Sequence, residues 1–92
     1  MKKVYKYTLN ACLRNNILMP VGAQILSAQY QVGTGICVWA LVDPDAPRED
    51  IRIFHVIGTG ISIDLPDDTL KFIDTIQVHP IVLHIFEEIH HS

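Results

Sequence analysis

The longest purely apolar run of the chain, Ile36–Val42, constrains the fold more than any other stretch. It contains the only tryptophan, Trp39, and it ends at Asp43–Pro47, a turn sequence whose two prolines cannot continue a strand. A short run rich in Ile, Val and Trp between turn signals is typical of a fully buried strand. We therefore expect Ile36–Val42 to be a central strand, with Trp39 enclosed in the core.

Most of the remaining chain alternates apolar and polar residues with the period of a β-strand. Gly33-Thr34-Gly35 is a tight connection, so Gln24–Val42 is predicted to form an antiparallel hairpin. Strict alternation would place Leu26 on the apolar face with Ala28, and Phe72 on one face with Asp74. The other predicted strands are Val4–Leu9, Ile51–Ile57, Leu70–Val78 and Ile81–Phe86, with a short piece at Ile17–Met19 that Pro20 terminates.

The segments between these strands read as connections: Asn10–Asn16, Ile61–Thr69 and a polar tail at Glu87–Ser92. No segment has the pattern of an amphipathic helix of ten or more residues. Six or seven short strands with turn signals about every 8–12 residues are typical of a small sandwich or barrel. We therefore predict an all-β fold, a small antiparallel β-sandwich or barrel, formed by residues 1–92 as a single domain.

Composition and charge narrow the function classes. The 92 residues carry a net charge of −3 with the charges scattered, which argues against binding long nucleic acid. No apolar run approaches the ~20 residues of a membrane helix, and the Lys- and Tyr-alternating start is not a signal peptide. Two cysteines, Cys12 and Cys37, lack a CxxC spacing, so we expect a reduced cytoplasmic protein. A small domain this rich in Ile, Val and Leu is also expected to be a homo-oligomer.

Gly58-Thr59-Gly60 is the first candidate binding element. Glycines after a strand let the backbone approach a ligand, and successive amides can hold an anion. Arg52 and His55 lie just upstream, on opposite faces of a regular strand. The competing interpretation is an ordinary turn that needs positive φ, which is far commoner.

Aromatic residues are the second candidate feature. Tyr5 and Trp39 are core residues first of all, but at a rim they can stack on a ring or base. The set of predicted ligand-binding residues is Tyr5, Trp39, Arg52, His55, Gly58, Thr59 and Gly60.

Metal and catalytic signatures are weak. His84 with His90 or His91, beside Glu87 and Glu88, is a thin cluster without a recognised ligand spacing, so no metal and no cofactor are predicted. There is no GxSxG motif, and acidic residues beside prolines more often cap turns. We predict that the protein is not an enzyme.

Motifs along nearly the whole chain resemble a family of small β-rich proteins encoded in bacteriophages and prophages. The most specific are Pro20-x-Gly22-Ala23-x-Ile25-Leu26-Ser27 and Trp39-Ala40-Leu41-Val42-Asp43-Pro44. The others are Lys6-Tyr7-x-Leu9, Arg52-x-Phe54, Gly58-Thr59-Gly60 and Leu83-His84-x-Phe86-Glu87. The resemblance implies a phage protein that acts in the cytoplasm of a bacterial host.

Three functions are therefore weighed. The first is a nonenzymatic anti-defence sponge that sequesters a nucleotide-type immune second messenger, of the cyclic dinucleotide or cyclic ADP-ribose type. The alternative is a protein–protein interaction module acting on a host or virion protein. The third, a small hydrolase of the same nucleotides, would need an activated nucleophile, a base and an anion stabiliser together.

Overall fold

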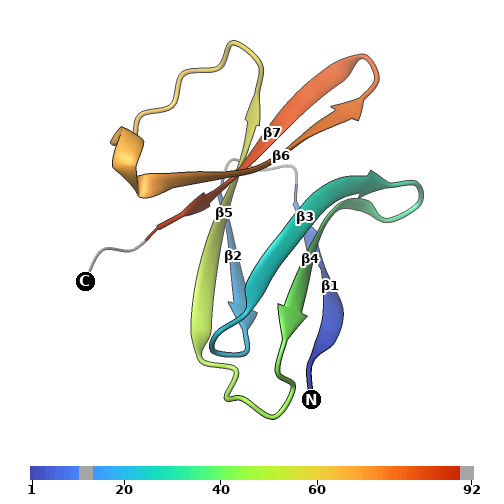
Figure 1. The fold of residues 1–92 in the computed structure, drawn as a ribbon. Coiled ribbons are helices and arrows are strands. Elements are labelled where there is room, and N and C mark those ends of the chain that lie inside the picture. Colours follow the sequence, from blue (N-terminus) through green and yellow to red (C-terminus); the bar gives the residue numbers. More distant parts are fainter. Residues whose placement is uncertain (11–13, 90–92) are drawn as a thin grey trace.

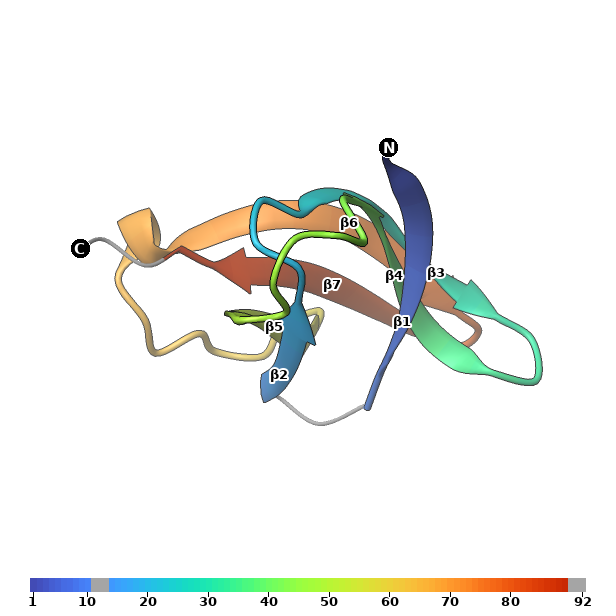
Figure 2. The same ribbon diagram turned by 90° about the horizontal axis from the view of Figure 1, so that it is seen from below.

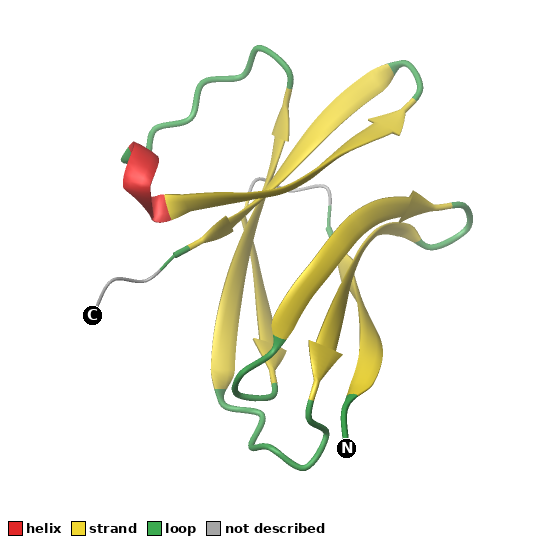
Figure 3. Ribbon diagram, viewed as in Figure 1, coloured by secondary structure: helices red, strands yellow, loops and turns green. Residues whose placement is uncertain are grey.

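The protein is described by a computed structural model, which covers residues 1–10 and 14–89 (Figure 1). Within these residues the chain forms strands, loops and one short 3₁₀ helix (Figure 3). The elements are β1 (Lys3–Leu9), β2 (Arg14–Met19), β3 (Gln24–Gln31), β4 (Gly35–Val42), β5 (Asp50–Gly58), η1 (Asp67–Thr69), β6 (Leu70–Val78) and β7 (Ile81–Glu88). The all-β prediction and the expected strand number are confirmed for this part of the chain.

The strands form two antiparallel sheets, ordered β1-β4-β3 and β2-β5-β7-β6 (Figures 1 and 2). Their facing sides enclose one apolar cluster that draws on both sheets, with Val38 and Ala28 from one and Phe54 and Ile85 from the other. The arrangement is a small sandwich, as predicted.

The edge strands β3 and β6 meet through a side chain. Asp74 Oδ2 on β6 accepts hydrogen bonds from the Ala28 amide at 3.3 Å and from Gln29 Nε2 at 3.2 Å. The carboxylate thereby covers part of an otherwise unpaired strand edge.

The apolar run forms the middle strand of its sheet, as predicted, but not all of it is enclosed. Ile36, Val38, Ala40 and Val42 point into the core, whereas Trp39 lies on the outer face and is only half-buried. The prediction of an enclosed Trp39 is therefore wrong. A strand in a two-layer sandwich has only one face against the core, even when both faces are apolar.

Two β-bulges overturn face assignments that strict alternation predicted. The β3–β4 register shifts between Ile25 and Ser27, which leaves Leu26 exposed instead of facing the core. The β6–β7 register shifts between Phe72 and Asp74, so Phe72 pairs with Phe86 on the outer face while Asp74 pairs with Ile85 on the inner one. An extra residue in one strand exchanges the faces of everything beyond it.

Two predicted segment ends are also corrected. The expected connection Asn10–Asn16 is shorter, because β2 already begins at Arg14. Asn15 fastens this start: its Oδ1 accepts from the Asn10 amide at 2.8 Å, and its Nδ2 donates to the Asn10 carbonyl at 3.1 Å. The expected polar tail begins later, because β7 continues through Glu88.

Two further features bear on the sequence analysis. Cys37 is fully buried, as expected, and Cys12 lies outside the described residues. The described residues contain no helix with the length and hydrophobicity that a membrane crossing would need.

Candidate functional site

The structure does not gather the predicted ligand-binding residues into one site. Trp39 lies on the outer face of the three-stranded sheet, and Tyr5 lies on β1 facing the other way. Arg52 and His55 point to opposite sides of β5, as alternation predicted. Gly58 ends β5, and Thr59 and Gly60 form the turn that follows it.

Arg52 has its partners within the chain. Its Nε donates to Glu87 Oε2, its Nη1 donates to the Ala23 carbonyl at 2.7 Å, and Nη1 lies 3.6 Å from Asp50 Oδ2. The Arg52 and Glu87 side chains are only 18% and 9% exposed. This network links the β2–β3 turn to the four-stranded sheet. Ligand binding by Arg52 stays a prediction.

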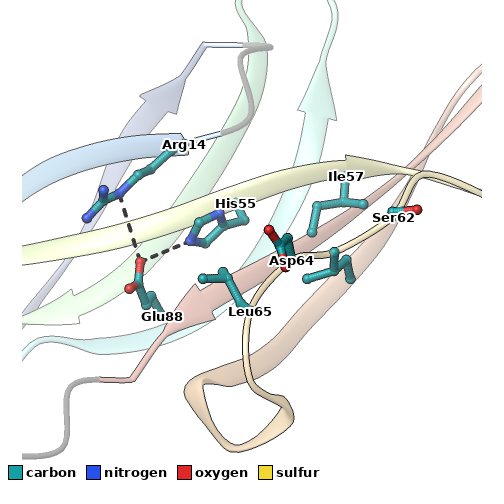
Figure 4. A pocket seen from close by; sticks show the side chains of 8 residues that line it. Arg14, His55, Ile57, Ser62, Asp64, Leu65 and Glu88 are labelled. Atoms are coloured by element: carbon teal, nitrogen blue, oxygen red, sulfur yellow. Dashed lines mark hydrogen bonds and ion pairs between the residues drawn. The ribbon is translucent and has the colours of Figure 1, made fainter.

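His55 lines a cavity of about 240 Å³ between the outer face of the four-stranded sheet and the loop that follows β5 (Figure 4). Its Nε2 donates to Glu88 Oε2 at 3.0 Å, and Arg14 Nε lies 3.9 Å from the same oxygen. Asp64 and Leu65 close the cavity from the loop side. Apart from that of Arg14, the fixed charges of this lining are carboxylates, so a phosphate is disfavoured here.

A hydrolytic arrangement is not assembled in this cavity. Ser62 also lines it, but its hydroxyl points away from the His55 imidazole (Figure 4). Nucleophilic catalysis requires the hydroxyl and the base within hydrogen-bond reach of one another.

Gly58-Thr59-Gly60 behaves as a turn. Gly60 has φ +85°, the Thr59 amide donates to the Val82 carbonyl at 3.3 Å, and the Ile61 amide donates to the Gly58 carbonyl at 3.1 Å. The Thr59 amide of the predicted anion nest and the Ile61 amide that follows it therefore already have backbone acceptors, which favours the turn interpretation.

The Thr59 side chain has a partner as well. His84 Nε2 lies 2.7 Å from Thr59 Oγ1, while His84 Nδ1 lies 3.0 Å from Thr75 Oγ1. Both ring nitrogens are thus held by threonine hydroxyls, which tie the turn to β7 and β6.

A different cleft collects aromatic rings and a cation. Tyr5 and Tyr7 of β1, Pro20 of the β2–β3 turn, and Pro44 and Arg48 of the β4–β5 loop enclose about 300 Å³. We call it the tyrosine–arginine cleft. Both loops lie beside the start of β1 in Figure 1, and the Val21 amide joins them by donating to the Pro47 carbonyl at 2.9 Å.

Arg48 is the only charged side chain among the described residues that line this cleft. It is exposed and forms no hydrogen bond or ion pair with any residue of the described ranges. Partial burial raises the pKa of Tyr7, and the positive charge of Arg48 partly opposes this. Tyr7 and Arg48 line the same cleft, so the guanidinium can meet an anion that enters beside the phenol.

The cleft can therefore hold a flat ring against tyrosine and an anionic group against arginine. Tyr5 was predicted from the sequence, whereas Tyr7, Arg48 and the two prolines were missed. Arg48 is a single cation between Pro47 and Glu49, and nothing local marks it, since its neighbours Tyr7 and Pro20 come from distant segments.

Metal binding finds no support in the described ranges, where no three His, Cys, Asp or Glu side chains stand close enough to hold an ion. His90 and His91, which completed the cluster weighed in the sequence, lie outside those ranges.

Comparisons with known proteins give a family and no function. Neither the curated proteins nor the solved structures include a match. The model of a family described as a domain of unknown function, DUF7352, matches residues 1–92. The chain therefore belongs to the DUF7352 family.

Proposed function

We propose that the protein is a nonenzymatic binder of a nucleotide-type small molecule, and that the tyrosine–arginine cleft is its binding site. The observation that carries the proposal is the exposed Arg48 guanidinium, unpaired within the described residues, beside the rings of Tyr5 and Tyr7. A nucleotide combines a flat base, which tyrosine can stack on, with a phosphate, which arginine binds through charge-assisted hydrogen bonds.

The size of the cleft limits what it encloses. Its volume of about 300 Å³ lies at the lower end of the range for small-molecule pockets. One nucleotide moiety suits this volume better than a whole cyclic dinucleotide. A larger second messenger would bind with one of its bases in the cleft and the remainder outside.

The biological role that we propose is sequestration of an immune second messenger in the cytoplasm of a bacterial host. This part of the proposal comes from the resemblance to phage-encoded proteins. A sponge needs affinity without turnover, and a cleft whose lining offers arginine and tyrosine but no nucleophile–base pair suits that requirement.

Calorimetric titration with cyclic dinucleotides and cyclic ADP-ribose isomers tests the proposal. Arg48→Ala removes a charge-assisted contact of about 1.5–3 kcal/mol, so binding should weaken roughly ten- to a hundredfold. Lys71→Ala is the matched control, because Lys71 is an exposed cation on β6. Equal affinity of the Arg48→Ala and wild-type proteins would move the site elsewhere.

The fate of the ligand separates the functional classes. Heating the complex should release the ligand unchanged, whereas an altered ligand means that the protein is an enzyme. No binding of any of these nucleotides at micromolar concentration would exclude the sponge.

A protein–protein module is the second candidate, and a different observation favours it. The outer face of the three-stranded sheet carries the half-buried Trp39 and Leu41 with the exposed Val4 beside them. Trp is enriched where proteins meet, so this apolar group is a candidate contact surface. Capture of a host or virion protein that Trp39→Ala abolishes, while nucleotides do not bind, would establish this function instead.

A further inference from the structure

The face of β1 that supplies the two tyrosines of the tyrosine–arginine cleft also carries a lysine. Lys3 pairs with Val42, and the same register sets Tyr5 and Tyr7 against two further β4 residues. All three β4 partners belong to the apolar core between the sheets. Because side chains alternate along a strand, Lys3, Tyr5 and Tyr7 lie on one face of β1.

The register also places Lys3 at one end of the cleft. Its partner Val42 ends β4, and Pro44, which lines the cleft, follows two residues later. Lys3 precedes Tyr5 by two residues, which is about 6–7 Å along a strand. A lysine carries its charge on a flexible four-carbon stem, so the ammonium group can reach the rim of the cleft beside Pro44.

Lys3 is available to a ligand. It is exposed, and it forms no hydrogen bond or ion pair with any residue in the described part of the chain. Asp43 follows the partner strand, but its Oδ1 accepts from the Asp45 amide at 3.0 Å. Lys6, on the opposite face of β1, is by contrast held by Gln31, whose Oε1 accepts from Lys6 Nζ at 2.8 Å. The start of β1 therefore adds a second available cation to the cleft.

Two cations beside the same aromatic rings suit a nucleotide with two phosphates. A single phosphate can be bound by Arg48 alone. A second phosphate would lie outside the cleft, because the volume of about 300 Å³ suits one nucleotide moiety. The chain as a whole has a net charge of −3, so this second anion needs a local cation, and Lys3 supplies it.

We propose that Lys3 forms a second phosphate subsite, and that the cleft selects nucleotides with two phosphates over nucleotides with one. The inference rests on the proposed nucleotide site and narrows the class of ligand that it takes. One base stacks on the tyrosine rings, Arg48 binds the phosphate inside the cleft, and Lys3 binds the phosphate outside it.

Matched ligands and matched variants test the subsite. Cyclic di-AMP and cyclic AMP share a base and differ in carrying two phosphates or one, and cyclic di-GMP and cyclic GMP form a second such pair. In calorimetric titration the wild-type protein should bind the two-phosphate member of a pair more tightly. Lys3→Ala should weaken that binding roughly three- to tenfold and leave the one-phosphate affinity unchanged.

Lys6→Ala is the matched control, because it removes an equal charge from the opposite face of the same strand. It should leave both affinities unchanged. Salt screens the attraction between an ammonium group and a phosphate, so the two-phosphate affinity should fall with ionic strength less steeply in Lys3→Ala than in wild type. Circular dichroism should show both variants folded, since both lysines are exposed.

The outcomes separate this inference from the proposed function. Equal wild-type affinity for both members of a pair would overturn the subsite while the nucleotide site at Arg48 stands. Unchanged two-phosphate binding by Lys3→Ala, or an equal loss for one-phosphate ligands, would do the same. Failure of all four nucleotides to bind, or binding that Arg48→Ala leaves intact, would overturn the proposed site and the subsite together.

Discussion

Two adjacent glutamates at the end of β7 offer a sharp test of the electrostatic structure. Glu87 faces the core side of the four-stranded sheet and pairs with Arg52, while Glu88 faces outward and pairs with His55 and Arg14. Their side chains are 9% and 21% exposed. Replacing each with glutamine removes one charge and almost no volume, so the pair of variants isolates the role of burial.

The expected cost for Glu87→Gln follows from the partner that it leaves behind. The Arg52 guanidinium is a cation held in a largely buried position. Breaking such a pair typically costs 3–5 kcal/mol, and Asp50 at 3.6 Å with the Ala23 carbonyl at 2.7 Å softens the loss. We therefore expect about 2–3 kcal/mol, a large part of the ~5–14 kcal/mol typical of a domain this size.

Glu88→Gln should cost less, about 1 kcal/mol or below. Glu88 is itself 21% exposed and its partner Arg14 is 56% exposed, so water replaces much of the lost interaction. Urea unfolding followed by circular dichroism gives both values, and the Glu87→Gln midpoint should fall by roughly 2 M. A Glu87→Gln protein as stable as the Glu88→Gln protein would refute the reasoning from burial.

Three further predictions concern a pKa, a strand edge and a turn. Burial raises the pKa of Tyr7 above its usual value of roughly 10, so the folded state holds this proton more tightly than the unfolded state. This contribution to the free energy of unfolding should be fully present below about pH 10 and be lost as pH rises through the folded pKa. The Tyr7→Phe protein should lack that decline in alkaline unfolding curves. Asp74→Ala leaves the Ala28 amide at the β3 edge without its acceptor, so it should lower the free energy of unfolding by about 1 kcal/mol and promote aggregation. Thermal melts with light scattering measure both effects. Asp74→Asn keeps an acceptor and should lower stability and promote aggregation less. Gly60 has φ +85°, so Gly60→Ala should lower the free energy of unfolding in urea by about 1–2 kcal/mol. Gly58 has no positive φ, and a Cβ at this position would meet only the Ile61 side chain at 3.3 Å, so Gly58→Ala should cost less. A larger cost for Gly58→Ala would contradict the turn assignment.

The local pattern of the sequence was sufficient to place the strands and most turns, although it began β2 too late and ended β7 too early. Alternation, proline and glycine act within a few residues, so β3, β4 and their connecting turn could be placed without knowing their neighbours. Alternation failed at Leu26 and Phe72 because a bulge depends on the partner strand, which local pattern does not specify.

The candidate site was decided by tertiary structure. Arg52 had the right chemistry for a phosphate, but its position opposite Glu87 was invisible in the sequence, and a nearby carboxylate determines whether a guanidinium is available. Nothing in the local sequence distinguishes Arg48, and only the packing of two loops against β1 places it beside Tyr5 and Tyr7.

The sequence by itself determined that this chain is a small antiparallel β protein with an apolar middle strand, because secondary structure and burial follow from short-range periodicity. Only the tertiary structure decided which face of that strand is enclosed, which cation is paired and where the clefts open. Those properties depend on pairings between residues far apart in the chain, and a single bulge or loop contact changes them without leaving a local trace.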